Sequence, residues 1–203
     1  MSQIEDERKF VIAGDQPVPD LSGVVELGPS ERFTLHATYV DTLDLTLARN
    51  RIVLRRRTGG GDEGWHLKLP GTDGRREEVH APLSDGPNSA MVPNALRSRV
   101  ADLIGNEALA PVATVRNKRT ERELRLGKTV VALLCDDHVR ASRGRDEKSW
   151  RELEVELVDG DRELLDRITE VFAAAGVPVS TSPSKLVTIL GEPGPASGEL
   201  GPD

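Results

Sequence analysis

The segment 150–157 alternates strictly between polar and apolar residues, and this pattern constrains the fold more than any other feature of the sequence. A period of two residues predicts a β-strand whose two faces carry different side chains. Same-face neighbours lie about 6.5–7 Å apart, and at an effective dielectric near 20 two like charges at that separation repel by roughly 2 kcal/mol. A solvated face tolerates this repulsion, whereas an enclosed space requires opposite charges or metal ions. The charged face carries Glu152, Glu154 and Glu156.

Other predicted strands repeat the arrangement with acids and with cations. The N-terminal segment places Glu5, Glu7 and Lys9 on one face. Two later strands carry cations in phase, namely Arg55 and Arg57 on the first, and His66 and Lys68 on the second. Two interpretations follow: separate faces that each meet water, or one shared interior lined by acids and bases together. Acids and bases together suit a metal–polyphosphate complex, because phosphoryl transfer requires neutralisation by metal ions and by Arg or Lys.

Short strands joined by Gly-rich turns, with few helices, indicate an α+β fold that is mainly antiparallel β. Helical spacing predicts two longer helices, over 94–104 and 162–175. The strand faces at 153–157 and 65–69 are apolar, and we expect them to pack against these helices. The charged faces would then point into the concavity of the sheet, as in a closed antiparallel barrel with helices packed outside.

Composition narrows the possible partners. The chain has 203 residues and a net charge of −7, which argues against general nucleic-acid binding. Its single cysteine, Cys135, excludes an internal disulfide and thiolate metal sites, so any metal would bind oxygen ligands, which favour Mg²⁺ or Mn²⁺. The sequence shows no membrane-spanning run and no signal peptide, and we expect a cytoplasmic protein that does not associate with membranes.

Taken in chain order, these motifs resemble the CYTH domains, also called triphosphate tunnel metalloenzymes. The resemblance implies an eight-stranded closed β-barrel with a triphosphate-binding tunnel, formed by residues 1–190, followed by a disordered linker-like tail at 191–203. Because some bacterial members continue into a CHAD domain, a C-terminal CHAD domain is an expected partner. The matching segments are ExExK at 5–9, Tyr-x-Asp-Thr at 39–42, Leu-Arg-x-Arg at 54–57, 65–68, 76–78, Arg119, Asp136, ExE at 154–156 and 184–185.

The resemblance also implies roles for individual residues. The expected ligands of two Mg²⁺ or Mn²⁺ ions are Glu5, Glu7, Glu78, Asp136, Glu154 and Glu156. The expected substrate-binding cations are Lys9, Arg55, Arg57, Lys68, Arg76, Arg119 and Lys185. Lys9 and Tyr39 are the catalytic candidates for removing a proton from water, and the choice between them stays open. The role of Glu152 also stays open, whereas Asp137 is expected in a turn and Asp41 as a turn cap or supporting residue.

The implied function is hydrolysis of inorganic triphosphate, and of other triphosphates, by a metal-activated water that attacks the terminal phosphorus. Two alternatives remain at this point. One is an adenylyl cyclase of class IV type, which expels pyrophosphate as the ribose hydroxyl attacks the α-phosphorus. The other is a non-catalytic module that binds polyphosphate.

Overall fold

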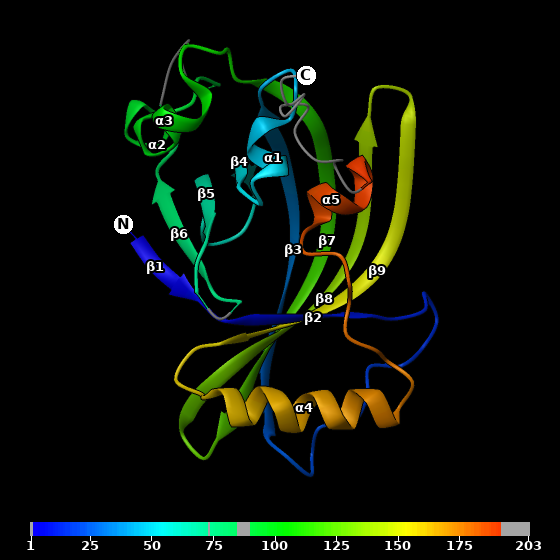
Figure 1. The fold of residues 1–203 in the computed structure, drawn as a ribbon. Helices are drawn as coiled ribbons and strands as arrows, with labels where there is room; N and C mark the ends of the chain where they lie inside the picture. Colours follow the sequence, from blue (N-terminus) through cyan, green and yellow to red (C-terminus); the bar gives the residue numbers. More distant parts are fainter. Residues whose placement is uncertain (1, 73, 85–89, 192–203) are drawn as a thin grey trace, which may run out of the picture.

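The computed structural model describes residues 2–72, 74–84 and 90–191, so that the predicted tail from 192 onward lies outside the described residues. An antiparallel sheet dominates the molecule (Figure 1). Its strands are β1 (Ser2–Glu5), β2 (Glu7–Val11), β3 (Glu26–Asp41), β4 (Val53–Thr58), β5 (Gly64–Pro70), β6 (Arg76–Ala81), β7 (Ala110–Leu126), β8 (Thr129–Arg143) and β9 (Asp146–Leu157). The helices are α1 (Thr46–Arg49), α2 (Asn94–Arg97), the 3-10 turn η1 (Ser98–Val100), α3 (Ala101–Ile104), α4 (Arg162–Ala174) and α5 (Lys185–Leu190).

The sheet has nine strands in the order β1-β6-β5-β4-β3-β7-β8-β9-β2. The sheet ends at β1, which pairs with β6, and at β2, which pairs with β9. These two end strands are consecutive in the chain. Asp6 lies between them, and its carboxylate binds Arg75 at 3.1 Å and Arg162 at 2.7 Å. The prediction of an eight-stranded closed barrel is therefore wrong in two respects: the first strand is split, and hydrogen bonds do not close the sheet there.

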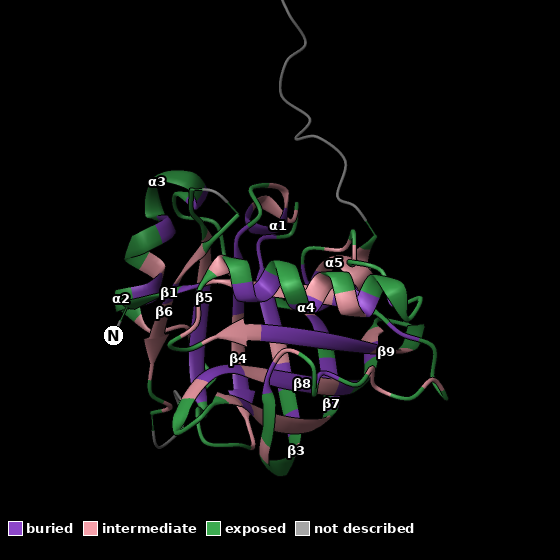
Figure 2. Cartoon of the chain, turned by 90° about the horizontal axis from the view of Figure 1, so that it is seen from below, coloured by how far each residue is buried: buried purple, intermediate pink, exposed green. Residues whose placement is uncertain are grey.

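Helix α4 covers the outer face of β2, β8 and β9, as the apolar alternation predicts (Figure 1). Asp161 caps the helix by accepting a hydrogen bond from the Leu164 amide at 2.9 Å. Phe172 packs edge-to-face on Phe10, with ring centroids 4.7 Å apart, within a cluster that includes Leu153. The helix buries this one side and exposes the other (Figure 2).

The second predicted helix, over 94–104, forms as the three short pieces α2, η1 and α3. Together they cover the outer face of β4 and β5, where Trp65 and Leu67 are buried. Strand β8 continues to Arg143 and β9 begins at Asp146, so only a short turn separates these two long strands. No helix in the described parts of the chain is both long and apolar enough to cross a membrane.

Helix α5 packs on the concave face, where Leu186 and Ile189 join a buried cluster with Val115 and Val139. Ser184 caps α5 by accepting a hydrogen bond from the Val187 amide at 3.2 Å. This cap fixes where the helix begins, and it brings the first helical residue, Lys185, into the interior of the sheet.

The glycine-rich turn predicted between β4 and β5 is present, and its geometry explains the residue type. Gly59 has a φ of 83°, and a Cβ there would lie 2.2 Å from the Thr34 carbonyl oxygen. Only glycine fits such a position. Asp41 acts as the predicted cap, because its carboxylate accepts hydrogen bonds from the Leu47 and Ala48 amides, each at 2.9 Å.

Candidate active site in the charged cavity

A cavity of about 410 Å³ lies on the concave side of the sheet. Every predicted site residue except Asp136 lines it. The strands place them there by alternation, since residues of one parity share the inner face. Those residues are Glu5, Glu7, Lys9, Tyr39, Arg55, Arg57, Lys68, Arg76, Glu78, Arg119, Glu154, Glu156 and Lys185. Acids and bases from distant parts of the chain therefore share one interior, and the interpretation of separate solvated faces is wrong.

Asp136 lies on the outer face of β8, which corrects its expected place in the cavity. Its carboxylate binds the Arg151 guanidinium at 2.8 and 2.9 Å. The next residue, Asp137, points inward, is fully buried and accepts two hydrogen bonds from Arg119 at 2.8 and 2.7 Å. A shift of one residue exchanges the faces of a strand, so Asp137 takes the interior position. The expectation that Asp137 lies in a turn is wrong as well.

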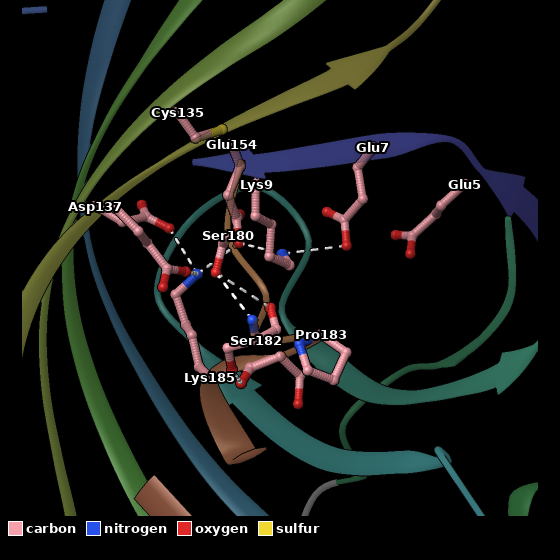
Figure 3. A network of polar contacts seen from close by, with 12 residues as sticks. Glu5, Glu7, Lys9, Cys135, Asp137, Glu154, Ser180, Ser182, Pro183 and Lys185 are labelled. Carbon is pink, nitrogen blue, oxygen red and sulfur yellow. Dashed lines mark hydrogen bonds and ion pairs between the residues drawn. The ribbon is translucent and has the colours of Figure 1, made fainter. Parts of the chain in front are cut away.

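Lys185 lies at the centre of a cluster of three buried carboxylates (Figure 3). Its Nζ is 2.8 Å from Asp137, 2.6 Å from Glu152 and 2.7 Å from Glu154. Burial lowers the pKa of Lys185, but these acids outweigh it and hold the pKa well above its ordinary value. Among the described residues, these three acids have ligand atoms within 4.8 Å of one another. The ammonium group already neutralises the position that they offer to a metal ion.

Lys9 is held as a cation by its neighbours. Its Nζ contacts Glu154 and lies 3.1 Å from Glu7 (Figure 3). Burial lowers the pKa of Lys9, yet Glu154 and Glu7 together raise it above its ordinary value. A lysine that stays protonated at neutral pH cannot accept a proton from water. The geometry therefore favours Lys9 as a phosphate-binding group and leaves Tyr39, which is buried beside Arg55, as the remaining catalytic candidate.

A second group of carboxylates includes two whose charged form is disfavoured by burial. Burial, with Glu78 nearby, raises the pKa of Glu5 to about 7, although Lys68 lies 2.5 Å from it. Burial, with Glu7 and Glu154 nearby, also raises the pKa of Glu156. Glu7 and Glu156 face each other across the β2–β9 pair. A divalent cation would stabilise the charged form of these buried carboxylates, and carboxylate oxygens are the ligands that Mg²⁺ and Mn²⁺ prefer.

Two arginines of the cavity keep unsatisfied hydrogen-bond donors. The Nε atoms of Arg55 and Arg57 are buried and have no hydrogen-bond partner within the described chain. Burial, followed by the nearby Arg55 and Arg119, lowers the pKa of Arg57 to about 9. Asp62 of the glycine-rich turn contacts the Arg57 guanidinium from outside. Crowded guanidinium groups with free donors fit an anion that carries several oxygens.

Sequence reasoning missed Asp137 as a site residue and left Glu152 undecided. The pairing of β8 with β9 places Asp137 directly opposite Glu152, and Glu154 lies two residues farther along the same face. Had the register of these two strands been known, Asp137 would have been preferred, since it shares a face with the glutamates. The sequence alone does not give that register.

Comparisons with known proteins agree with this geometry. The CYTH domain model matches residues 3–183. An uncharacterized protein of Mycobacterium tuberculosis is 37% identical over 98% of this chain, which spans 42% of that relative's length. Human thiamine-triphosphatase is 30% identical over 92% of the chain and 84% of its own length.

Solved structures share the fold. A candidate adenylate cyclase from Bacillus halodurans superposes with a TM-score of 0.64 at 18% identity, over 92% of this chain and 97% of its own. A candidate adenylyl cyclase from Hippeastrum, whose dominant activity is triphosphatase, gives a TM-score of 0.55 at 19% identity, over 92% and 95% of the two chains. Together with the match over residues 3–183, the human relative establishes that this chain belongs to the CYTH domain family.

Proposed function

We propose that the chain hydrolyses inorganic triphosphate with the help of Mg²⁺ or Mn²⁺, and that the reaction takes place in the charged cavity. One observation carries the proposal. The unpaired donors of Arg55 and Arg57 share a single enclosed space with Glu5 and Glu156, whose pKa values are raised. A metal–triphosphate complex would compensate both groups, since it would bring divalent cations to carboxylates whose charged form burial disfavours and oxygens to the guanidinium groups.

The residues divide by charge. Arg55, Arg57 and Arg119 would bind phosphate oxygens, and their planar guanidinium groups allow two hydrogen bonds to one phosphate. Lys9 and Lys68 would supply further positive charge. Binding the triphosphate in this way would orient its terminal phosphorus and stabilise the negative charge that spreads over the departing phosphate group.

The carboxylates would hold the metal. We assign Glu5, Glu7 and Glu156 to this role, with Glu78 beside them, because Lys185 already neutralises Glu154 on the other side of the cavity. When bound, the metal ions lower the pKa of a water molecule and polarise phosphate oxygens. The proposal includes two such metal ions in the cavity. We assign to Tyr39 the role of accepting or relaying the proton of that water.

Phosphate release from triphosphate tests the proposal. We expect release with Mg²⁺ or Mn²⁺ and none with a chelator. Glu7→Gln should lower the rate by about 10²-fold or more, since one ligand of a metal that stabilises the transition state is lost. Glu163→Gln, an exposed change on α4, is the matched control. Metal-independent release, or full activity of Glu7→Gln, contradicts the proposal.

An adenylyl cyclase is the second candidate, because two of the solved structures with this fold carry that tentative name. A cyclase would convert ATP with Mn²⁺ to cyclic AMP and pyrophosphate. We expect phosphate release without cyclic AMP. Cyclic AMP that accumulates without phosphate would favour the cyclase.

The full-length protein is a separate question. The chain spans 42% of the mycobacterial relatives that it matches, so these relatives have room for a further domain. A C-terminal CHAD domain and a cytoplasmic location therefore stay predictions.

A further inference from the structure

A second cavity, of about 610 Å³, adjoins the charged cavity. It lies between α1, the start of β4, the turn that joins β5 to β6, and the segment 181–187. The two cavities share four lining residues, Val53, Arg76, Pro183 and Ser184. The two spaces therefore meet at these residues, and a ligand that occupied both would pass beside Arg76.

The charged side chains of the second cavity are arginines, as far as its lining is described, and no described lining residue is acidic. We call the four residues Arg49, Arg51, Arg75 and Arg76 the arginine vestibule. Four positive charges around one cavity contrast with the net charge of −7 of the whole chain. Such a local field attracts anions and repels cations.

Part of the vestibule is committed to the fold and part is free. Arg75 binds Asp6 at 3.1 Å, and Arg76 donates a hydrogen bond to the Pro183 carbonyl oxygen at 3.0 Å. The Nε of Arg49 is buried and has no hydrogen-bond partner within the described chain. An unsatisfied buried donor costs stability, and a ligand that accepts its hydrogen bond recovers that cost.

A structural role accounts only partly for these arginines. Arg49 lies in the last turn of α1, where a cation interacts favourably with the helix dipole, but only weakly in so short a helix. Arg51 has a φ of 60°, a conformation that glycine and asparagine adopt more readily than arginine. An arginine at this position contributes charge rather than local backbone stability.

We propose that the arginine vestibule binds the part of a linear polyphosphate chain that extends beyond the three phosphates held in the charged cavity. The inference rests on the proposed function and names a substrate class for it: inorganic polyphosphates longer than triphosphate. Guanidinium groups match phosphate oxygens in pairs. The described lining contains no aromatic side chain on which a base could stack, so an inorganic chain fits better than a nucleotide.

The test is a double variant, Arg49→Gln/Arg51→Asn. Asparagine tolerates the positive φ at 51, so the charge is removed with little backbone strain. We expect kcat/KM for a medium-length polyphosphate to fall about 10- to 100-fold, as for the loss of one or two charge-assisted hydrogen bonds. The kcat/KM for triphosphate should stay within about twofold, because triphosphate does not reach the vestibule.

The matched control removes two cations elsewhere, by Lys128→Gln/Arg167→Gln. Both residues are exposed, and Arg167 lies on α4, at the opposite end of the molecule from α1 (Figure 1). The kcat/KM of this control variant for both polyphosphate and triphosphate should equal that of the wild type. Equal loss on both substrates in the vestibule variant, no loss on either, or an equal loss in the control would overturn the proposal.

A binding measurement separates this inference from the proposed function. In a chelator, where turnover stops, labelled polyphosphate should still bind the wild-type chain, and the vestibule variant should bind it at least about 10-fold more weakly. If the protein hydrolyses neither substrate but the vestibule variant still binds polyphosphate more weakly than the wild type, the proposed function is overturned and the proposed binding at the vestibule is not. Orthophosphate should not compete at equal phosphate concentration; effective competition would mean a site for released product and would overturn the proposed chain binding.

Discussion

Replacing Lys185 with methionine removes the cation from the centre of the three buried carboxylates. In the wild type their charges are balanced by Lys185, Arg119 and Lys9. The substitution leaves a net charge of about −1 in the cluster, and Glu152 loses its ion pair at 2.6 Å. Removing one partner of a buried ion pair costs about 3–5 kcal/mol. For a chain of this size we expect a fall in Tm of roughly 6–20 °C.

The same variant should gain a dependence on divalent cations. Without the ammonium group, ligand atoms of Asp137, Glu152 and Glu154 remain within 4.8 Å of one another. A divalent ion that binds the folded state at 100 times its Kd would restore about 2.7 kcal/mol. Differential scanning fluorimetry with and without Mn²⁺ measures both effects, and a Lys128→Gln variant is the control for a charge lost at the surface.

The pH dependence gives an independent check. Despite burial, Lys185 and its cationic neighbours hold the pKa of Glu154 and Asp137 below the ordinary values of 4.5 and 3.8. Their contribution to stability is therefore present above those ordinary values and is lost as pH falls through the lower folded pKa. In Lys185→Met the carboxylate pKa should rise, so that stability increases as pH falls from 7 toward 5. A variant as stable as wild type, indifferent to Mn²⁺ and with an unchanged pH profile would refute the role assigned to Lys185.

Two further predictions concern the cavity. Arg57→Met should raise Tm by a few degrees, because it removes a crowded cation that burial disfavours, and should weaken triphosphate binding at least about 10-fold in a competition assay. An unchanged affinity would exclude Arg57 from the anion site. Asp136→Asn should keep phosphate release within about twofold, whereas Asp137→Asn should lower it at least about 10-fold, since only Asp137 lies inside beside Arg119. The reverse order would restore Asp136 to the site.

Period-two alternation predicted most of the site from the sequence. It put Glu5 and Glu7 in phase with Lys9, and Arg55 in phase with Arg57, and these residues line the cavity together with Lys68. It failed in β8, where residues 129–135 are nearly all apolar. Helix α4 covers the outside of this strand while its inside faces the interior, so both faces are apolar and the parity of Asp136 and Asp137 is hidden.

Prediction of the fold from the sequence has a comparable limit. The Gly-rich turn at Gly59 and the helix predicted over 162–175 follow from local residue preferences, and both are present. The break at Asp6 was not predicted, because Glu5 and Glu7 keep the same parity on either side of it. The break depends on Arg75 and Arg162, which lie far away in the sequence and hold the Asp6 carboxylate. A single sequence does not show such long-range pairing.

The joint binding of metal and triphosphate is tested most directly by titrating Mn²⁺ into the protein with and without a non-hydrolysable imido analogue of triphosphate. We expect the analogue to tighten Mn²⁺ binding at least about 10-fold, and Mn²⁺ to tighten analogue binding by the same factor. Glu7→Gln/Glu156→Gln should abolish this coupling. Mn²⁺ affinity that is the same with and without the analogue would contradict the shared site.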